Sequence, residues 1–184
     1  MNKKINYKIM KKAAIIGMIF LSTIIQAQAQ NDGISRFFSK YENDMDFTVV
    51  NITGRMFGMF TNIEVESPED KELLNSISKL TGLKILSRND AENGHALYKE
   101  AFNLIPQKEY DELMTIRDQD KNMRFLIKEK AGKISELLMI IGGEHEFFIM
   151  SIVGEIDLKQ ISRLSKAMDI DGLDKLDKLE DKTH

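Results

Sequence analysis

Cysteine and tryptophan are absent from this chain of 184 residues, and proline occurs only twice. Without cysteine there is no disulfide framework, no thiolate metal site and no cysteine nucleophile. Without tryptophan, a carbohydrate site built on aromatic platforms is disfavoured. A basic excess is also missing, since the formal net charge is −3, and this argues against a nucleic-acid binder. The hydrophobic share of 42% nevertheless excludes a wholly disordered chain.

The chain also has no hydrophobic run long enough to span a membrane. Its longest hydrophobic run lies near the N-terminus, at residues 13–25. It has 13 positions, whereas a membrane-spanning helix needs roughly 20. A lysine-rich start precedes this run, and Ala27-Gln28-Ala29 follows it. This order is typical of a secretory signal peptide. We therefore predict a signal peptide over residues 1–29 in place of an uncleaved membrane anchor, and a mature domain over residues 30–184.

The predicted cleavage changes the charge of the mature chain. Residues 1–29 contain five lysines and no acid, so the net charge falls from −3 to −8 when they are removed. An acidic protein repels nucleic acid and anionic membrane surfaces, so we expect no nucleic-acid partner. We also expect no transmembrane segment in residues 30–184, because no second apolar run approaches the length of a span.

Hydrophobic periodicity predicts a series of helices and strands along residues 30–184. Helices are expected at 33–41, around 56–60, from Ser67 to Gly82, at 97–105, at 108–117 and from Asp157 to Met168, followed by a short acidic helix or tail over 169–184. Strands are expected at 47–52, 83–87, 123–130, 134–141 and 147–153.

These elements indicate a single α+β domain. The last three strands are separated by short glycine-bearing links, which predicts a three-stranded antiparallel meander. Strands 47–52 and 83–87 are joined through helices and can therefore be parallel, which gives a mixed sheet of roughly five strands with packed helices. Residues 137–141 are apolar without alternation, so we expect this strand to be covered on both faces.

The residues with catalytic potential do not form a complete motif. His145 lies between Glu144 and Glu146 at a predicted hairpin turn. In a strand the two flanking carboxylates point to the opposite face from the histidine, so a solvated turn is the expectation. His95 is expected on a helix surface. Ser76 and Lys79 match the Ser-x-x-Lys motif of penicillin-recognising enzymes, but the companion motifs of those enzymes are missing. The chain also lacks a Gly-x-Ser-x-Gly elbow and a P-loop.

Metal and cofactor sites are equally poorly supported. Residues 169–172 resemble the start of a calcium loop, but the glycine comes too early for an EF-hand. The acidic patch of Glu42, Asp44 and Asp46 fits a solvated loop, and His184 is the last residue. We therefore assign no catalytic residue, no metal ligand and no cofactor.

One short segment has more large apolar residues than its expected helix requires. Met56, Phe57, Met59 and Phe60 surround Gly58, whereas one narrow helix face needs fewer apolar positions. Methionine side chains adapt to partners of varied shape. These four residues are therefore the candidate apolar binding surface, for a small apolar ligand or an envelope protein partner.

The order of several segments resembles a known family. An early FFSKY is followed by FTVVNITGRMF, YDELMTIRD and the long stretch from KNMRFLIKEKAGKISELLMII to GEIDLKQISRLSKAM, with GLDKL near the end. This order is similar to the exported bacterial proteins of the domain of unknown function 4252 family, typical of Bacteroidetes. The resemblance implies an exported protein of the Gram-negative envelope, located in the periplasm, and it transfers no catalytic residue.

The leading functional hypothesis is a non-enzymatic module of the cell envelope that binds, senses or regulates. It depends on the absence of a convergent set of titratable groups and on the excess of apolar residues at 56–60. A hydrolase whose site is assembled from distant residues, with Ser76, Glu144 or His145 as candidates, is the first alternative. A structural subunit of an envelope assembly is the second.

Overall fold

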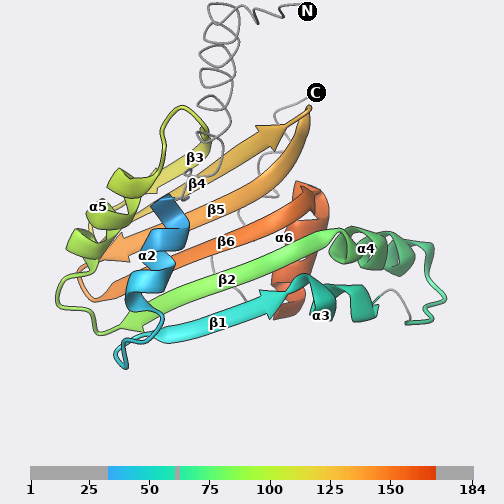
Figure 1. Cartoon of the computed structure of the whole chain (residues 1–184), viewed down its shortest axis with the longest axis horizontal. Coiled ribbons are helices and arrows are strands. Elements are labelled where there is room, and N and C mark those ends of the chain that lie inside the picture. Colours follow the sequence, from blue (N-terminus) through green and yellow to red (C-terminus); the bar gives the residue numbers. More distant parts are fainter. Residues whose placement is uncertain (1–32, 61–62, 169–184) are drawn as a thin grey trace, which may run out of the picture. The chain divides into compact units, whose positions relative to one another are not determined.

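The computed structural model describes residues 33–60 and 63–168, and within these ranges six strands form one antiparallel sheet (Figure 1). The strands are β1 (Thr48–Thr53), β2 (Leu80–Asn89), β3 (Asp111–Arg117), β4 (Lys121–Lys130), β5 (Lys133–Gly143) and β6 (Glu146–Ile156). Their order across the sheet is β1-β2-β6-β5-β4-β3. The predicted α+β class is confirmed, and the predicted signal peptide and C-terminal tail lie outside the described residues.

Helices cover both faces of this sheet. The helices α2 (Gly33–Tyr41) and α5 (Gly94–Leu104) lie on one face, which we call the α2/α5 face. The helices α3 (Gly54–Met59), α4 (Pro68–Ser78) and α6 (Leu158–Met168) contribute to the core on the other face, which we call the α6 face. In Figure 1, α2 and α5 lie in front of the sheet and α6 lies behind it.

The central strand β5 contributes to both cores. Leu137 and Met139 belong to the cluster on the α6 face, whereas Leu138 and Ile140 belong to the cluster on the α2/α5 face. All four side chains are fully buried, because successive residues of a strand point to opposite faces and both faces are covered. The prediction that residues 137–141 are covered on both sides is confirmed.

The expected mixed sheet is wrong, since every pairing among the described strands is antiparallel. The strands β1 and β2 are neighbours, with Val50 opposite Ile85. In Figure 1, the connection between them, which contains α3 and α4, stays at one end of the sheet. A connection of this kind returns the chain at the end it left, whereas parallel strands need a crossover along the sheet. The predicted meander is confirmed as β4–β5–β6.

The sixth strand replaces a predicted helix. Residues 111–117 form β3 and pair with β4, with Met114 opposite Phe125 and Ile116 opposite Met123. A seven-residue segment satisfies helical and extended patterns almost equally well, so the ladder offered by β4 decides its conformation. Gly82 is also misassigned, because α4 ends at Ser78 and Gly82 lies within β2.

The expected helix starts at Ser67 and Asp157 have capping bonds. The Ser67 hydroxyl accepts the backbone N–H of Asp70 at 3.4 Å, and Pro68 occupies the first position of α4, where no N–H is needed. The Asp157 carboxylate accepts the backbone N–H of Lys159 at 3.0 Å. These caps place the starts of α4 and α6, the two helices that flank the candidate site.

Candidate functional site

A largely enclosed apolar pocket of about 290 Å³ lies on the α6 face of the sheet. Its described lining consists of apolar side chains. The sheet contributes Ile52, Leu80, Leu83, Met150 and Ile152. The helices and the segment after α3 contribute Met56, Phe57, Phe60, Ile63, Leu74, Ile77, Ile161 and Leu164. Such a void offers dispersion contacts to an apolar guest and no described polar group that fixes its orientation.

The floor of the pocket follows from strand register. Ile52 of β1 lies opposite Leu83 of β2, and Leu83 lies opposite Ile152 of β6. Directly paired residues of neighbouring strands point to the same face, so these three side chains form a continuous apolar row. The row crosses three strands, and it brings together residues that are far apart in the sequence.

The position of α3 depends on a glycine. A Cβ atom on Gly54 would lie 3.0 Å from the carbonyl oxygen of Thr81, tighter than an ordinary contact. Glycine therefore lets the first turn of α3 approach β2, and this approach places Phe57 over the sheet. Phe57 is only 5% exposed and belongs to the core cluster on the α6 face.

The four residues of the candidate apolar surface do not share one environment. Met56, Phe57 and Phe60 line the pocket, whereas Met59 does not contribute to its described lining and is 68% exposed. Met56 is 50% exposed, so it lies at the boundary between the pocket and solvent. The excess of apolar residues in 56–60 therefore predicted the side of the pocket that α3 and Phe60 form. The residues of α4 and α6 that line the other side were not predicted.

A shallow polar groove adjoins the apolar pocket. Ile63 and Leu74 line both spaces, so the two meet at these residues. The groove also has Lys71, Asn75 and Ser78 on α4, with two glutamates on the segment before it. A ligand with an apolar chain in the pocket can therefore place a polar end in the groove, where hydrogen-bonding groups of both charges are available.

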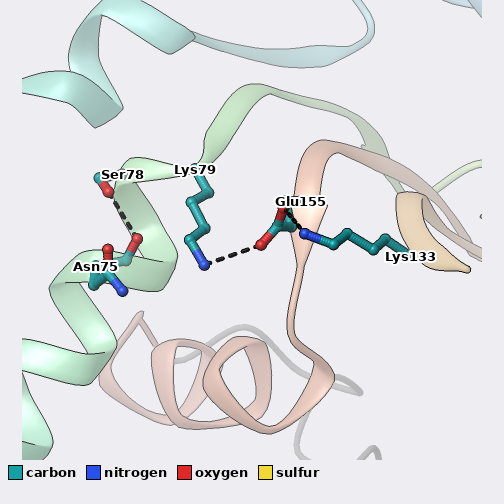
Figure 2. Close-up of polar contacts among 5 residues, drawn as sticks. All are labelled: Asn75, Ser78, Lys79, Lys133 and Glu155. Carbon is teal, nitrogen blue, oxygen red and sulfur yellow. Dashed lines mark hydrogen bonds and ion pairs between the residues drawn. The ribbon is translucent and has the colours of Figure 1, made fainter. Parts of the chain in front are cut away.

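A separate polar depression of about 430 Å³ contains Ser76 and Lys79, the two residues of the Ser-x-x-Lys match. Figure 2 shows that Lys79 and Lys133 both point to Glu155, with N–O distances of 3.0 and 2.6 Å. Hydrogen bonds from Lys133 and Lys79 lower the pKa of the Glu155 carboxyl below its ordinary value. Lys79 is thus engaged by a carboxylate and is not placed as a base for Ser76.

The other hydrolase candidates lie at the opposite end of β5. Glu144 and His145 follow its last residue and are exposed, whereas Ser76 lies beside Lys133, its first residue. Eleven strand residues at about 3.4 Å each separate the two ends by roughly 35 Å. These residues therefore cannot act in one site.

The remaining titratable candidates are dispersed. His95 is exposed in the first turn of α5, and His184 and the calcium-like stretch 169–172 lie outside the described residues. Across residues 33–60 and 63–168, no group of three or more histidine and acidic side chains has the arrangement of a metal site. None of the helices in the same ranges has the length and hydropathy needed to cross a membrane.

The sequence analysis missed a buried polar cluster formed by Glu136, Tyr110 and Ser151. The carboxylate of Glu136 is only 8% exposed and accepts hydrogen bonds from the hydroxyls of Tyr110 and Ser151, each at 2.7 Å. These bonds, from the residue before β3 and from β6, compensate the burial of the carboxylate. Glu136 directly precedes the apolar run 137–141 in the same strand. An acidic residue next to a buried run is the sequence signal that could have predicted a buried carboxylate with hydrogen-bond partners.

The match to a family model covers most of this fold. The model, described as Domain of unknown function (DUF4252), matches residues 41–164. The chain belongs to this family. The matched range contains all six strands, α3, α4 and α5, and every described residue that lines the apolar pocket. No curated protein and no solved structure was found to match the chain.

Proposed function

We propose that the protein is a non-enzymatic binding module that holds an aliphatic ligand in the pocket between α3, α4, α6 and the sheet. The observation that carries the proposal is a largely enclosed void whose described lining is apolar. Soluble proteins pack their interiors densely and leave few voids larger than a water molecule. A space of this size is therefore better explained by a guest than by imperfect packing.

The volume limits the size of the ligand. At about 290 Å³, the pocket lies at the lower end of the ~300–1,000 Å³ range of ligand sites. It is about twice the ~150 Å³ apolar cavity that accommodates benzene, so it accepts roughly a dozen carbon atoms. A single medium-length alkyl chain fits this space, and a sterol or a two-chain lipid does not.

The adjoining groove supports an amphiphile in preference to a pure hydrocarbon. A chain anchored between Phe57 and Ile161 can extend past Leu74 to the groove. There the Lys71 ammonium and the Asn75 amide offer donors to a hydroxyl or carboxyl end. The ligand class we propose is therefore a monoalkyl amphiphile of about ten to twelve carbons.

We further propose that this binding takes place in the periplasm, after export, as part of a sensing or regulatory role in the cell envelope. The support is the lysine-rich start, the short apolar run and the Ala27-Gln28-Ala29 site. Detection of the processed chain in the periplasmic fraction would test the location independently of any ligand. Retention of the protein in the cytoplasm with its N-terminus intact would contradict it.

The binding proposal is tested by isothermal titration calorimetry with 1-decanol, whose alkyl chain fits the volume of the pocket. We expect saturable binding of 1-decanol. Leu164→Phe, which places a ring in the pocket, should weaken this binding, whereas Leu158→Phe on the same helix should not, because Leu158 is not among the residues that line the pocket. Absence of saturable binding, or equal affinity in both variants, would refute the proposal.

A further inference from the structure

The two edges of the sheet differ in their protection against strand pairing. At one edge, β3 carries Asp111, Glu112 and Arg117, and its register shifts between Glu112 and Met114. Charges and bulges of this kind prevent an edge strand from pairing with another chain. At the other edge, β1 has the sequence TVVNIT, which contains neither charge nor proline, and its six pairs with β2 run without a shift.

The unprotected edge is also open to solvent. Residues Thr48, Val49, Asn51 and Thr53 are exposed, and none of the described elements lies beyond β1 in the sheet order. The segments that flank β1 carry further exposed apolar side chains. Met45 is 97% exposed in the preceding turn, and Met59 is 68% exposed in α3. A regular, uncharged, β-branched edge with apolar neighbours is the kind of surface that accepts an added strand.

We propose that β1 pairs antiparallel with β1 of a second copy of this chain and joins two six-stranded sheets into one. A two-fold axis perpendicular to the sheet makes the α6 faces of both copies continuous, and residues of matching parity then lie opposite each other. With Asn51 opposite Asn51 of the second copy, Val50 lies opposite Ile52 of the second copy. Both are half-buried side chains on the α6 face, so the pairing completes their burial.

The charges at the two ends of β1 complement each other in this arrangement. Asp44 and Asp46 precede the strand, and Arg55 follows it. Antiparallel pairing brings the start of one strand beside the end of the other, so the first turn of α3, which carries Arg55, comes close to the Asp44–Asp46 turn of the other copy. Arg55 has no ion-pair partner among the described residues, and Asp46 remains 63% exposed although it pairs with Arg88.

The same symmetry explains why association stops at two copies. An isologous interface uses the same patch on both partners, so within the described sheet pairing through β1 leaves the β3 strands as the two edges. Those edges are charged and bulged, and they do not add further copies. The inference concerns β1 and is independent of whether the apolar pocket binds a ligand.

The test is sedimentation equilibrium of the protein purified from cells that express the full chain, over a wide range of concentration. We expect a monomer–dimer equilibrium. Asn51→Lys places two lysines opposite each other across the two-fold axis and should weaken association about tenfold. Thr115→Lys, an exposed position on the β3 edge, is the matched control and should leave it unchanged. Arg55→Glu should weaken the dimer, and Arg55→Lys should retain it.

Hydrogen exchange provides a second readout that does not depend on mass. The backbone amides of 48–53 that point away from β2 should become more protected as concentration rises, and those of 111–117 should not. A monomer at every concentration overturns the inference. A dimer that Asn51→Lys leaves intact, or that Thr115→Lys weakens equally, overturns the assignment to β1. Circular dichroism of each variant distinguishes lost association from lost folding.

Discussion

Substitution of Leu164 by phenylalanine tests whether the space between α6 and the sheet is a real void. Leu164 is half-buried, lies in α6 and lines the pocket. The substitution adds three carbon atoms at a side chain that borders about 290 Å³ of apolar space. In a fully packed core these atoms would have to displace their neighbours, and in an empty pocket they replace a void.

The two situations predict opposite signs. Burial of additional apolar atoms stabilises by roughly 0.8 kcal/mol per CH₂ group, so three carbons give an upper value of about 2 kcal/mol. Overpacking of a filled core instead costs about 1–3 kcal/mol. For a chain of this size, a gain of about 2 kcal/mol corresponds to a rise in Tm of roughly 4–8 °C. The difference between the two outcomes is therefore well outside the error of a thermal melt.

The assay is thermal and urea unfolding of the wild type, Leu164→Phe and Leu158→Phe without added ligand. Leu158 lies in the same helix and packs against the same core, but it is not among the residues that line the pocket. We expect an increase in the free energy of unfolding for Leu164→Phe and no comparable increase for Leu158→Phe. A destabilised Leu164→Phe protein would show that the pocket is already filled by side chains and would remove the basis of the binding proposal.

Three further predictions concern the positions of the helices, the ion-pair network and the buried acid. Gly94→Ala should lower the free energy of unfolding in urea by about 1–3 kcal/mol, because the new Cβ would lie 2.3 Å from the carbonyl oxygen of Glu146. Gly58→Ala is the control: its Cβ would meet no described atom within 4 Å, so it should raise the free energy of unfolding by about 0.5–1 kcal/mol. Because the pKa of Glu155 is lowered, its ion pairs stabilise the fold fully above pH 4.5, and this stabilisation is lost as the pH falls through the lowered pKa. The melting temperatures of wild type and Glu155→Gln should therefore differ above pH 4.5 and converge in acid. A difference independent of pH would contradict the pairing. Ser151→Ala removes one of two hydroxyl donors from a buried carboxylate and should cost about 1.5–3 kcal/mol in urea unfolding, so an unchanged midpoint would exclude that hydrogen bond.

The elements predicted well are those whose signals are local. A capping serine followed by proline marks the start of α4, and glycine-bearing links between apolar runs mark the β4–β5–β6 meander. In both cases a few neighbouring residues determine the backbone geometry. The segment 111–117 has no comparable signal, because seven residues with three apolar positions fit a short helix or a strand, and only pairing with β4 selects the strand.

The candidate site was only partly predictable for the same reason. Met56, Phe57 and Phe60 were conspicuous because they are large apolar residues crowded into a short segment, and all three line the pocket. Ile152 and Ile161 gave no such signal, since they are ordinary apolar residues of a strand and a helix. Only the folded chain brings them opposite α3.

By itself, the sequence determined the α+β class, the meander, two helix starts and one wall of the pocket. It also led to the prediction of an exported acidic domain with no cysteine chemistry. Tertiary structure decided the direction of β1 against β2, the identity of β3, and the pocket itself. The physical reason is that caps and turns depend on residues a few positions apart. The pocket is instead the volume left between side chains that lie about a hundred positions apart in the sequence, from Ile52 to Leu164.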